Sequence, residues 1–441
     1  MNGARFRWDV GLSGPARRIA ELDHTPMRVL AGPGTGKTFA LMRRVARLLQ
    51  GGATPNRILV CTFTRTAARD LQKELENLGV PGAEQVWAGT IHAFCFSLLS
   101  RAEVLEATGR VPRPLLKFEE RFLLEDLNGD GLGGIRDRER RLQAFNAAWA
   151  RLQSDTPGWP QDPVDKAFHT DLTGWLRFHQ AMLIGELVPE ALRYLRDNPA
   201  SPHRRAFDHV LVDEYQDLNR AEQALLDLLA EEGHLVVIGD EDQSIYSFKF
   251  AHPEGIATFD KTHTNTHDET LEECRRCPRL VLELANSLIS NNHRSRRVLK
   301  PLPENPDGEV LVLQWRSIEE EAHGIAEIIR RRIQKGEVNP GRVLVLAPRR
   351  QLGYAVRNAL NELGVFAHSF FHEEALDDER AQEAFTLLTL LANQEDRVAL
   401  RCWCGFGSNS LLSGDWARLR QHCETSGDSP RVALERLASG D

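Results

Sequence analysis

Residues 31–38, AGPGTGKT, have the composition and spacing of a loop that binds phosphate groups. The three glycines let the backbone curl so that successive N–H groups point inward at anionic oxygens. Lys37 would reach the β- and γ-phosphates of a nucleotide, and the hydroxyl of Thr38 would ligate Mg²⁺. Relative to the usual pattern G-x-x-x-x-G-K-S/T, Ala31 is a small deviation at the first position. The expected nucleotide contacts are Gly32, Pro33, Gly34, Thr35, Gly36, Lys37 and Thr38.

A second candidate site lies in residues 210–217, VLVDEYQD, where an apolar run ends in two adjacent carboxylates. Asp213 would hold the metal ion through water, and Glu214 would orient and deprotonate the attacking water. An Asp-Glu pair after a strand is also often only a solvated strand end. The phosphate-binding loop upstream favours the catalytic interpretation.

Repeated strand–loop–helix segments must position these residues. Strands are predicted at 29–31, 57–64, 85–90, 207–212 and 235–238, and helices at 12–22, 66–78 and 91–99. This alternation predicts an α/β fold with a parallel sheet and helices on both faces. Ligands of such sheets bind at the carboxyl ends of the strands, where both candidate sites occur.

The rest of the chain shows two further patterns. Between about 101 and 205, charged segments of helical period predict a helical insertion, and the first domain is expected to end near Pro253. A second series then predicts strands at 309–315 and 342–347 and helices at 319–334 and 352–363. The last sixty or so residues are charged and helical in pattern.

Composition bounds the class of protein but not its ligand. The 441 residues carry a net charge of −8, which neither indicates nor excludes a locally basic groove for nucleic acid. Seven cysteines suit free thiols in a reducing compartment. No apolar run is long enough to span a membrane, and the first residues lack the apolar core of a signal peptide. We therefore expect a cytoplasmic protein without membrane partners.

Together these motifs resemble superfamily 1 DNA helicases of the UvrD/Rep/PcrA type, over nearly the whole chain. The resemblance also rests on CTFTRTAARDL at 61–71, GTIHAF at 89–94, GDEDQSIYSFKFA at 239–251 and LEECRRCPRLVLELANSLI at 271–289. It implies two RecA-like domains, 1A and 2A, with helical insertions 1B and 2B. The implied boundaries are 1–100 and 206–255 for 1A, 101–205 for 1B, 256–375 for a partial 2A and 376–441 for the start of 2B.

The resemblance also implies ligands and roles for single residues. ATP with Mg²⁺ would bind between the RecA-like domains, and single-stranded DNA, including junctions with duplex, would cross their tops. Gln243 would sense the γ-phosphate, and Arg276 would donate charge to it from the second domain. The alternative for Arg276 is a surface arginine, because Cys274 and Arg275 replace the usual asparagine and aromatic.

The implied DNA contacts are of two kinds. The stacking platforms are Phe63, Tyr246 and Phe248, with ordinary core packing as the alternative for each residue taken alone. The phosphate contacts are Thr62, Thr64, Thr90, His92 and Lys249, with Arg69 nearby.

The end of the site that would hold the base departs furthest from the family. Ala16 stands in place of the adenine-reading glutamine, and Phe39 in place of an arginine after the phosphate-binding loop. In the family an arginine and an aromatic residue stack on opposite faces of the base. We hypothesise that the two residue types have exchanged places here, so that Phe39 stacks on one face of the base and Arg275 on the other. Stacking would remain, but hydrogen-bond readout of adenine would be weak.

Three weaker patterns are open to more than one interpretation. Residues 126–137 have oxygen ligands at EF-hand spacing but lack the terminal Glu, which favours a helix-hairpin loop over calcium binding. The pairs Cys274/Cys277 and Cys402/Cys404 could bind a metal but are expected to be free thiols. The basic run at 293–300 is expected to be a solvated face, with a DNA contact as the alternative.

The family's last two motifs, a KGLEW-like and a TRA-like segment, do not occur in the sequence. We therefore expect an incomplete 2A domain whose motifs come from a missing C-terminal half or a partner protein. The resemblance implies an ATP-dependent DNA helicase or translocase, 3′–5′ on single-stranded DNA, which unwinds duplex in repair or replication. The alternative is an ATP-gated regulatory protein that binds single-stranded DNA, or a helicase subunit without autonomous hydrolysis.

Overall fold

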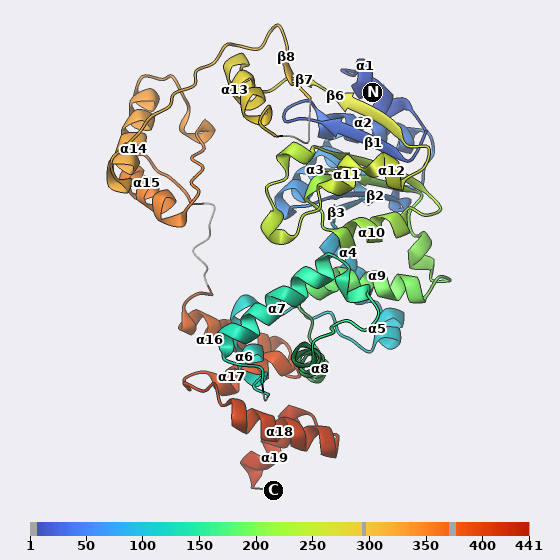
Figure 1. Ribbon diagram of the computed structural model, residues 1–441, viewed down its shortest axis with the longest axis vertical. Coiled ribbons are helices and arrows are strands. Elements are labelled where there is room, and N and C mark those ends of the chain that lie inside the picture. The colour runs from blue at the N-terminus through green and yellow to red at the C-terminus, as the bar shows by residue number, and fades with distance from the viewer. Residues whose placement is uncertain (1–6, 130, 293–296, 370–375, 441) are drawn as a thin grey trace, which may run out of the picture. The chain divides into compact units, whose positions relative to one another are not determined.

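The computed structural model describes residues 7–129, 131–292, 297–369 and 376–440 (Figure 1). They form two compact units, one of Met1–Gly308 with Thr389–Asp441 and the other of Glu309–Leu388. No helix in these ranges is both long and apolar enough to cross a membrane.

The first unit is built around a six-stranded parallel sheet with strand order β3-β2-β4-β5-β1-β6. Its strands are β1 (Met27–Ala31), β2 (Ile58–Thr62), β3 (Trp87–Thr90), β4 (His209–Val212), β5 (His234–Gly239) and β6 (His267–Leu271). Because all the strands are parallel, their carboxyl ends share one edge of the sheet. The predicted α/β fold with a RecA-like parallel sheet is confirmed.

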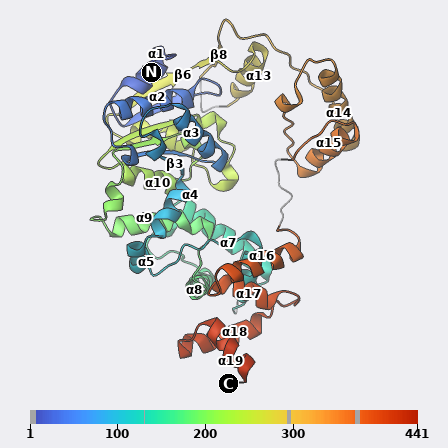
Figure 2. The same ribbon diagram turned by 180° about the vertical axis from the view of Figure 1, so that it is seen from behind.

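Helices cover both faces of this sheet, because successive strand residues point to opposite sides. In β2, Ile58 and Val60 pack with α1 (Gly14–Glu21), α2 (Lys37–Gln50) and α3 (Arg65–Asn77). Leu59 and Cys61 pack with α4 (Ile91–Leu99), α9 (Leu187–Asp197) and α10 (Arg220–Leu229) on the other face. The two views in Figures 1 and 2 show the sheet between these groups.

The first sheet continues beyond the boundary expected near Pro253. After two short helices, α11 (Glu254–Ala257) and α12 (Phe259–Thr262), strand β6 pairs with β1 at the edge of the sheet. Its sequence, HDETL, has no apolar run that would predict a strand. Its carboxylates are paired instead, since Glu269 lies 2.7 Å from Arg18 and Asp268 lies 2.7 Å from Arg28.

Three short elements follow β6 in the first unit. They are β7 (Glu273–Cys274), α13 (Arg279–Ile289) and β8 (Lys300–Pro301), and β7 pairs with β8 in parallel. Of the predicted basic run at 293–300, residues 293–296 lie outside the described ranges.

The predicted insertion between 101 and 205 is helical. It contains α5 (Ala102–Thr108), α6 (Lys117–Asp126), α7 (Ile135–Ala150) and α8 (Pro163–Phe178) in addition to α9. The C-terminal helices α17 (Arg397–Gly405), α18 (Ser413–Ser426) and α19 (Pro430–Ser439) belong to the same unit, and α17 and α18 pack against α6.

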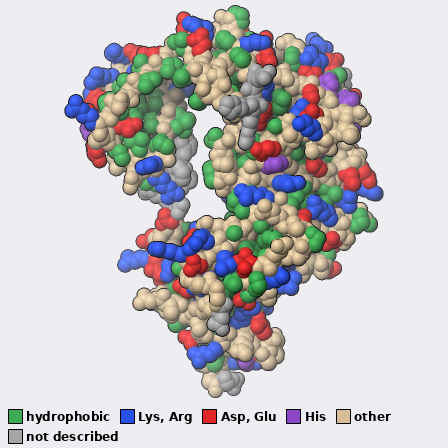
Figure 3. Space-filling model, in the orientation of Figure 1, with side chains coloured by type: hydrophobic (Ala, Val, Ile, Leu, Met, Phe, Trp, Pro, Cys, Tyr) green, Lys and Arg blue, Asp and Glu red, His purple; other side chains and the backbone are tan. Residues whose placement is uncertain are grey.

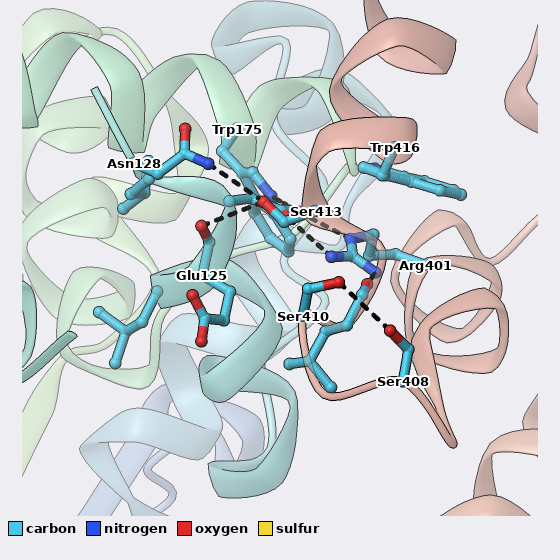
Figure 4. Close-up of polar contacts among 12 residues, drawn as sticks. Glu125, Asn128, Trp175, Arg401, Ser408, Ser410, Ser413 and Trp416 are labelled. Carbon is cyan, nitrogen blue, oxygen red and sulfur yellow. Dashed lines mark hydrogen bonds and ion pairs between the residues drawn. The ribbon is translucent and has the colours of Figure 1, made fainter. Parts of the chain in front are cut away.

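A buried ion pair joins these two groups of helices (Figure 4). The guanidinium of Arg401 is fully buried and donates to both carboxylate oxygens of Asp126, at 2.6 and 2.7 Å. The indole of Trp175 donates a third hydrogen bond to Asp126, at 2.9 Å. Asp126 is the first residue of the EF-hand-like segment, and its last residue, Asp137, accepts a hydrogen bond from Gly134 N–H. Both carboxylates are thus engaged by protein donors, which supports the helix-hairpin interpretation.

In the second unit the two predicted helices form but the two predicted strands do not. Helices α14 (Ile318–Gln334) and α15 (Arg350–Glu362) pack around Ala322, Ala326 and Val356. Segments 309–315 and 342–347 are irregular, and Val312 and Leu346 are 91% and 84% exposed. A strand requires a hydrogen-bonded neighbour, and the described part of this unit provides none. Helix α16 (Glu379–Ala392) crosses the boundary between the units.

Candidate nucleotide and nucleic-acid site

The loop between β1 and α2 has the backbone that its glycines permit. Gly34 and Gly36 have φ angles of 71° and 89°, in the left-handed region that side chains disfavour. The hydroxyl of Thr35 donates to Gly32 C=O at 2.9 Å and closes the turn. Gly36 is the N-cap of α2, so the unpaired N–H groups of that helix open on the loop. This arrangement can bind phosphate oxygens.

The carboxyl end of β4 brings the two candidate acids to this loop. Thr38 Oγ1 donates to Asp213 Oδ2 at 3.0 Å, and Lys37 Nζ lies 3.1 Å from Glu214 Oε2. Lys37 is only 8% exposed. Glu214 has a φ of 55°, an uncommon conformation for a residue with a side chain. Lys37 and Glu214 are 177 residues apart in the sequence, so the two motifs form one cluster only in the folded chain.

Carboxylates crowd this cluster. Burial, reinforced by the charge of Glu214, raises the pKa of Asp213. The same two causes raise the pKa of Asp217 to about 7. Asp217 Oδ1 is buried without a hydrogen-bond partner in the described part of the chain. Three carboxylates around one ammonium favour an additional cation, and carboxylate and hydroxyl oxygens are ligands that suit Mg²⁺. The residues therefore fit a magnesium ion beside bound phosphates.

A hydrogen-bonded chain that the motifs do not predict continues from Glu214 through Gln216 and Asp240 to Gln243. Gln216 Nε2 donates to Glu214 Oε2 at 2.9 Å, and Gln216 Oε1 accepts from the N–H of Asp240 at 3.0 Å. Gln243 Nε2 donates to Asp240 Oδ2 at 2.8 Å. Gln216 is buried and lies inside the VLVDEYQD motif, two residues after Glu214. Its closeness to the acids in the sequence was the signal that could have identified it.

Arg297 also joins this chain. Its guanidinium lies 2.5 Å from Asp240 Oδ1 and 2.7 Å from Glu241 Oε2, and its side chain is 19% exposed. The basic pattern at 293–300 predicts a solvated face. That interpretation is wrong for Arg297, because two carboxylates at the end of β5 bind it.

The segment after β6 lies directly on the phosphate-binding loop. Arg275 N–H donates to Gly34 C=O at 2.9 Å, and a Cβ placed on Gly34 would lie 2.8 Å from both Arg276 Cβ and Cys274 Sγ. Arg275 and Arg276 are both exposed. Phe39 is 41% exposed, and the guanidinium of Arg43 lies 4.8 Å from its ring centroid.

The three predicted stacking residues form one aromatic group. The ring of Tyr246 lies 4.9 Å from that of Phe63 and 5.8 Å from that of Phe248, which is 70% exposed. Lys249 Nζ lies 5.2 Å from the Phe63 ring and 5.4 Å from the Tyr246 ring. Aromatic faces beside a cation are the elements of a sequence-tolerant platform for single-stranded nucleic acid.

The predicted phosphate contacts are less uniform. Thr64 and Thr90 are N-caps, whose hydroxyl oxygens accept from Ala67 N–H at 3.1 Å and Ala93 N–H at 3.3 Å. His92 Nδ1 lies 3.2 Å from a carboxylate oxygen of Glu222. Thr62 is 2% exposed within β2, so the structure does not bring it to the surface.

Neither cysteine pair lies in a group of metal-ligating side chains among the described residues. All seven cysteines are free. Within the described ranges, no three His, Cys, Asp or Glu side chains are grouped to hold a metal ion. A Mg²⁺ ion at Asp213 and Thr38 would therefore need further ligands from the bound phosphates.

Comparison with known proteins agrees with this geometry. Residues 16–249, more than half of the chain, match the family model of the AAA domain, and residues 185–328 match that of the viral superfamily 1 RNA helicase core domain. The ATP-dependent DNA helicase PcrA of Bacillus subtilis is 26% identical over 413 residues, which cover 88% of this chain and 54% of that protein. The ATP-dependent DNA helicase UvrD1 of Mycobacterium bovis is 28% identical over 414 residues, 89% of this chain and 54% of that protein.

A third relative, the ATP-dependent DNA helicase PcrA of Leuconostoc citreum, is 30% identical over 325 residues, 68% of this chain and 41% of that protein. The chain thus spans about half the length of these relatives. With the phosphate-binding loop, the acid pair and the parallel sheet in place, the chain belongs to the AAA-domain family and, within it, to the UvrD/PcrA-type superfamily 1 helicases.

Proposed function

We propose that this chain is the N-terminal ATPase part of an ATP-dependent DNA helicase or translocase that moves 3′–5′ on single-stranded DNA. The observation that carries the proposal is the hydrogen-bonded chain from Lys37 through Glu214 to Gln243. Three residues beyond Gln243 the same loop presents Tyr246, the central ring of the aromatic group. A change in charge at the phosphates therefore has a short physical path to the nucleic-acid surface.

Each residue of the nucleotide site has a distinct role in this proposal. The phosphate-binding loop and Lys37 hold the β- and γ-phosphates, and Thr38 and Asp213 hold Mg²⁺, which supplies charge stabilisation to the phosphoryl group. Glu214 accepts the proton of the attacking water. On binding of the γ-phosphate, Lys37 exchanges its contact with Glu214 for the phosphate and leaves that carboxylate free to act as a base.

Arg276 completes the proposed mechanism. Its backbone lies against Gly34 and its side chain is exposed, so the guanidinium can reach toward the phosphates without breaking an internal ion pair. Such an arginine stabilises the charge of the transition state and makes hydrolysis depend on its position. The expected second domain at 256–375 would include Arg276, but β6 pairs in the first sheet and the first compact unit extends to Gly308, so we propose that Arg276 acts from this first unit.

At the base we propose that stacking dominates over hydrogen-bond readout. Phe39 is partly exposed, and Ala16, where the family reads adenine, has no polar side chain. Phe39 and Arg275 would then sandwich the base. Comparable turnover of GTP and ATP would support this proposal, whereas strict preference for ATP would contradict it.

Steady-state ATP hydrolysis, measured with and without single-stranded DNA, tests the proposed function. We expect DNA to stimulate hydrolysis and Lys37→Ala to abolish it. A hydrolysis rate that neither rises when DNA is added nor falls in Lys37→Ala would refute the proposal. A separate strand-separation assay, on junctions whose single strand lies on either the 3′ or the 5′ side of the duplex, tests unwinding and its polarity. A cytoplasmic location in a repair or replication pathway belongs to the same proposal.

One observation favours a second candidate, a subunit or ATP-gated regulatory protein without autonomous hydrolysis. Segments 309–315 and 342–347 expose apolar side chains and lack strand neighbours in the described residues of the second unit. We propose that strands from a C-terminal half or from a partner protein pair with them. Nucleotide binding without turnover would favour this candidate.

A further inference from the structure

Phe250 occupies a backbone conformation that aromatic side chains rarely adopt. Its φ and ψ angles are 64° and 26°, in the left-handed region, at the end of the short helix Ser247–Lys249. The turn is fixed by hydrogen bonds from Phe250 N–H to Ser247 C=O and from Ala251 N–H to Tyr246 C=O. A glycine would adopt this conformation without strain.

Packing in the interior does not account for this strain. Phe250 is only partly buried and belongs to neither of the two hydrophobic cores that the described residues form around the sheet. A strained residue that is not required by a core is a candidate for a role in binding.

The partner of Phe250 comes from the helical insertion. The guanidinium of Arg151, at the end of α7, lies 5.5 Å from the Phe250 ring centroid. Arg151 is exposed, and in the described ranges it has no carboxylate within ion-pair distance. Acidic and basic side chains are interspersed over the face seen in Figure 3.

We infer that Phe250 and Arg151 extend the single-stranded DNA surface from the β5 loop to the helical insertion. Phe250 supplies an aromatic ring directly after Lys249 in the same loop, and Arg151, which lies over that ring, supplies a phosphate contact from a different element. A ring and an unpaired guanidinium match the π-face of a base and the charge of the backbone, whatever the base sequence. The inference rests on the proposed function, because it assumes that the aromatic group binds DNA.

The strain makes the test sharp, because removing the side chain should stabilise the fold while weakening binding. The probe is a fluorescein-labelled oligothymidylate of about 16 nucleotides, titrated by anisotropy at several salt concentrations. We expect Phe250→Gly to unfold at the same or a higher temperature than the unmodified chain, and to bind about tenfold more weakly. Phe250→Leu keeps the strain but removes the ring, and should also weaken binding.

Gln180→Gly is the matched control. Gln180 is exposed after α8 with a φ of 51°, so this change relieves the same kind of strain without touching the aromatic group. It should raise thermal stability and leave binding unchanged. Arg151→Gln should lower the slope of log affinity against log salt by about 0.7, the value for one phosphate of a single strand.

Two results would overturn the inference. One is that Phe250→Gly binds the oligonucleotide as tightly as Gln180→Gly does, and the other is that it loses stability, which would assign Phe250 to packing. Lys249→Gln separates this failure from failure of the proposed function. If Lys249→Gln weakens binding but Phe250→Gly does not, only the inference fails, whereas no binding by the unmodified chain would remove the proposed function itself.

Discussion

Two clusters of buried charge in the first unit differ in how completely each charge is neutralised. Between the insertion and the C-terminal helices, one carboxylate, Asp126, meets the guanidinium of Arg401 at 2.6 and 2.7 Å and an indole donor as well. At the end of β4, three carboxylates share the single ammonium of Lys37.

The difference separates a structural cluster from a functional one. A buried ion pair with all donors engaged holds two groups of helices together and has no charge left for a ligand. Crowded carboxylates with raised pKa values, together with a strained Glu214, cost stability and are relieved by a bound cation or by a proton. Variants in the two clusters should therefore fail in opposite ways.

The largest effect is expected on catalysis at the β4 cluster. Glu214→Gln keeps the shape of the side chain but removes the base, so kcat should fall by about 10²- to 10⁴-fold. Nucleotide binding and the circular dichroism spectrum should be unchanged, because the amide can still lie beside Gln216. Retained DNA-stimulated hydrolysis in this variant would contradict the assignment of Glu214.

The next effect is expected on stability at the helical anchor. Arg401→Met leaves Asp126 buried without its cation and should lower the free energy of unfolding by about 3–5 kcal/mol. Urea unfolding measures this change, and Arg431→Gln on α19, which breaks exposed pairs with Glu395 and Glu435, is a control with little expected effect. Nucleotide binding should be unaffected. Equal stability of the two variants would show that the anchor is not built as described.

A smaller, pH-dependent effect is expected from His179, which lies beside this anchor. Burial holds its pKa well below the usual 6.5. Trp416 Nε1 donates to its Nε2 at 3.0 Å, and its Nδ1 lies 2.8 Å from Trp175 C=O, as in a neutral ring. The unfolded chain takes up a proton near pH 6.5 and the folded chain does not, so stability is full above that pH and falls on acidification.

The loss should have a slope of up to about 1.4 kcal/mol per pH unit, the value for one proton. His179→Gln removes the titrating group, so the difference between the two stability curves isolates this residue from other histidines. Parallel curves between pH 6.5 and 5 would contradict a neutral buried His179.

The smallest effect is expected from calcium. The EF-hand-like segment at 126–137 begins with a carboxylate that Arg401 already occupies, so added CaCl₂ should not change the unfolding temperature. A rise in that temperature that Asp137→Asn abolished would show that the segment binds calcium after all.

Local features could be predicted from the sequence, and features that depend on distant partners could not. The glycines before Lys37 and the apolar run before Asp213 define their own turn and strand, so the loop, five strands and the acid pair were predictable. Strand β6 was missed because its charged side chains are paired with arginines on α1 and β1. Arg297 and Arg401 are ordinary surface residues by sequence, and only the fold places each of them beside a carboxylate.

The segments at 309–315 and 342–347 show the converse case, in which a local pattern predicts strands that do not form. Their apolar patterns satisfy the local rule for strands, but a strand also needs neighbours, and the described part of the second unit has none.

Binding of ATP to this chain, titrated with and without Mg²⁺, tests the central claim most directly, because it does not require a complete motor. If the β4 cluster is a cation-requiring nucleotide site, Mg²⁺ should tighten binding, and both Lys37→Ala and Asp213→Asn should weaken it. Binding that is equally tight in EDTA and in both variants would show that the crowded carboxylates serve some other purpose.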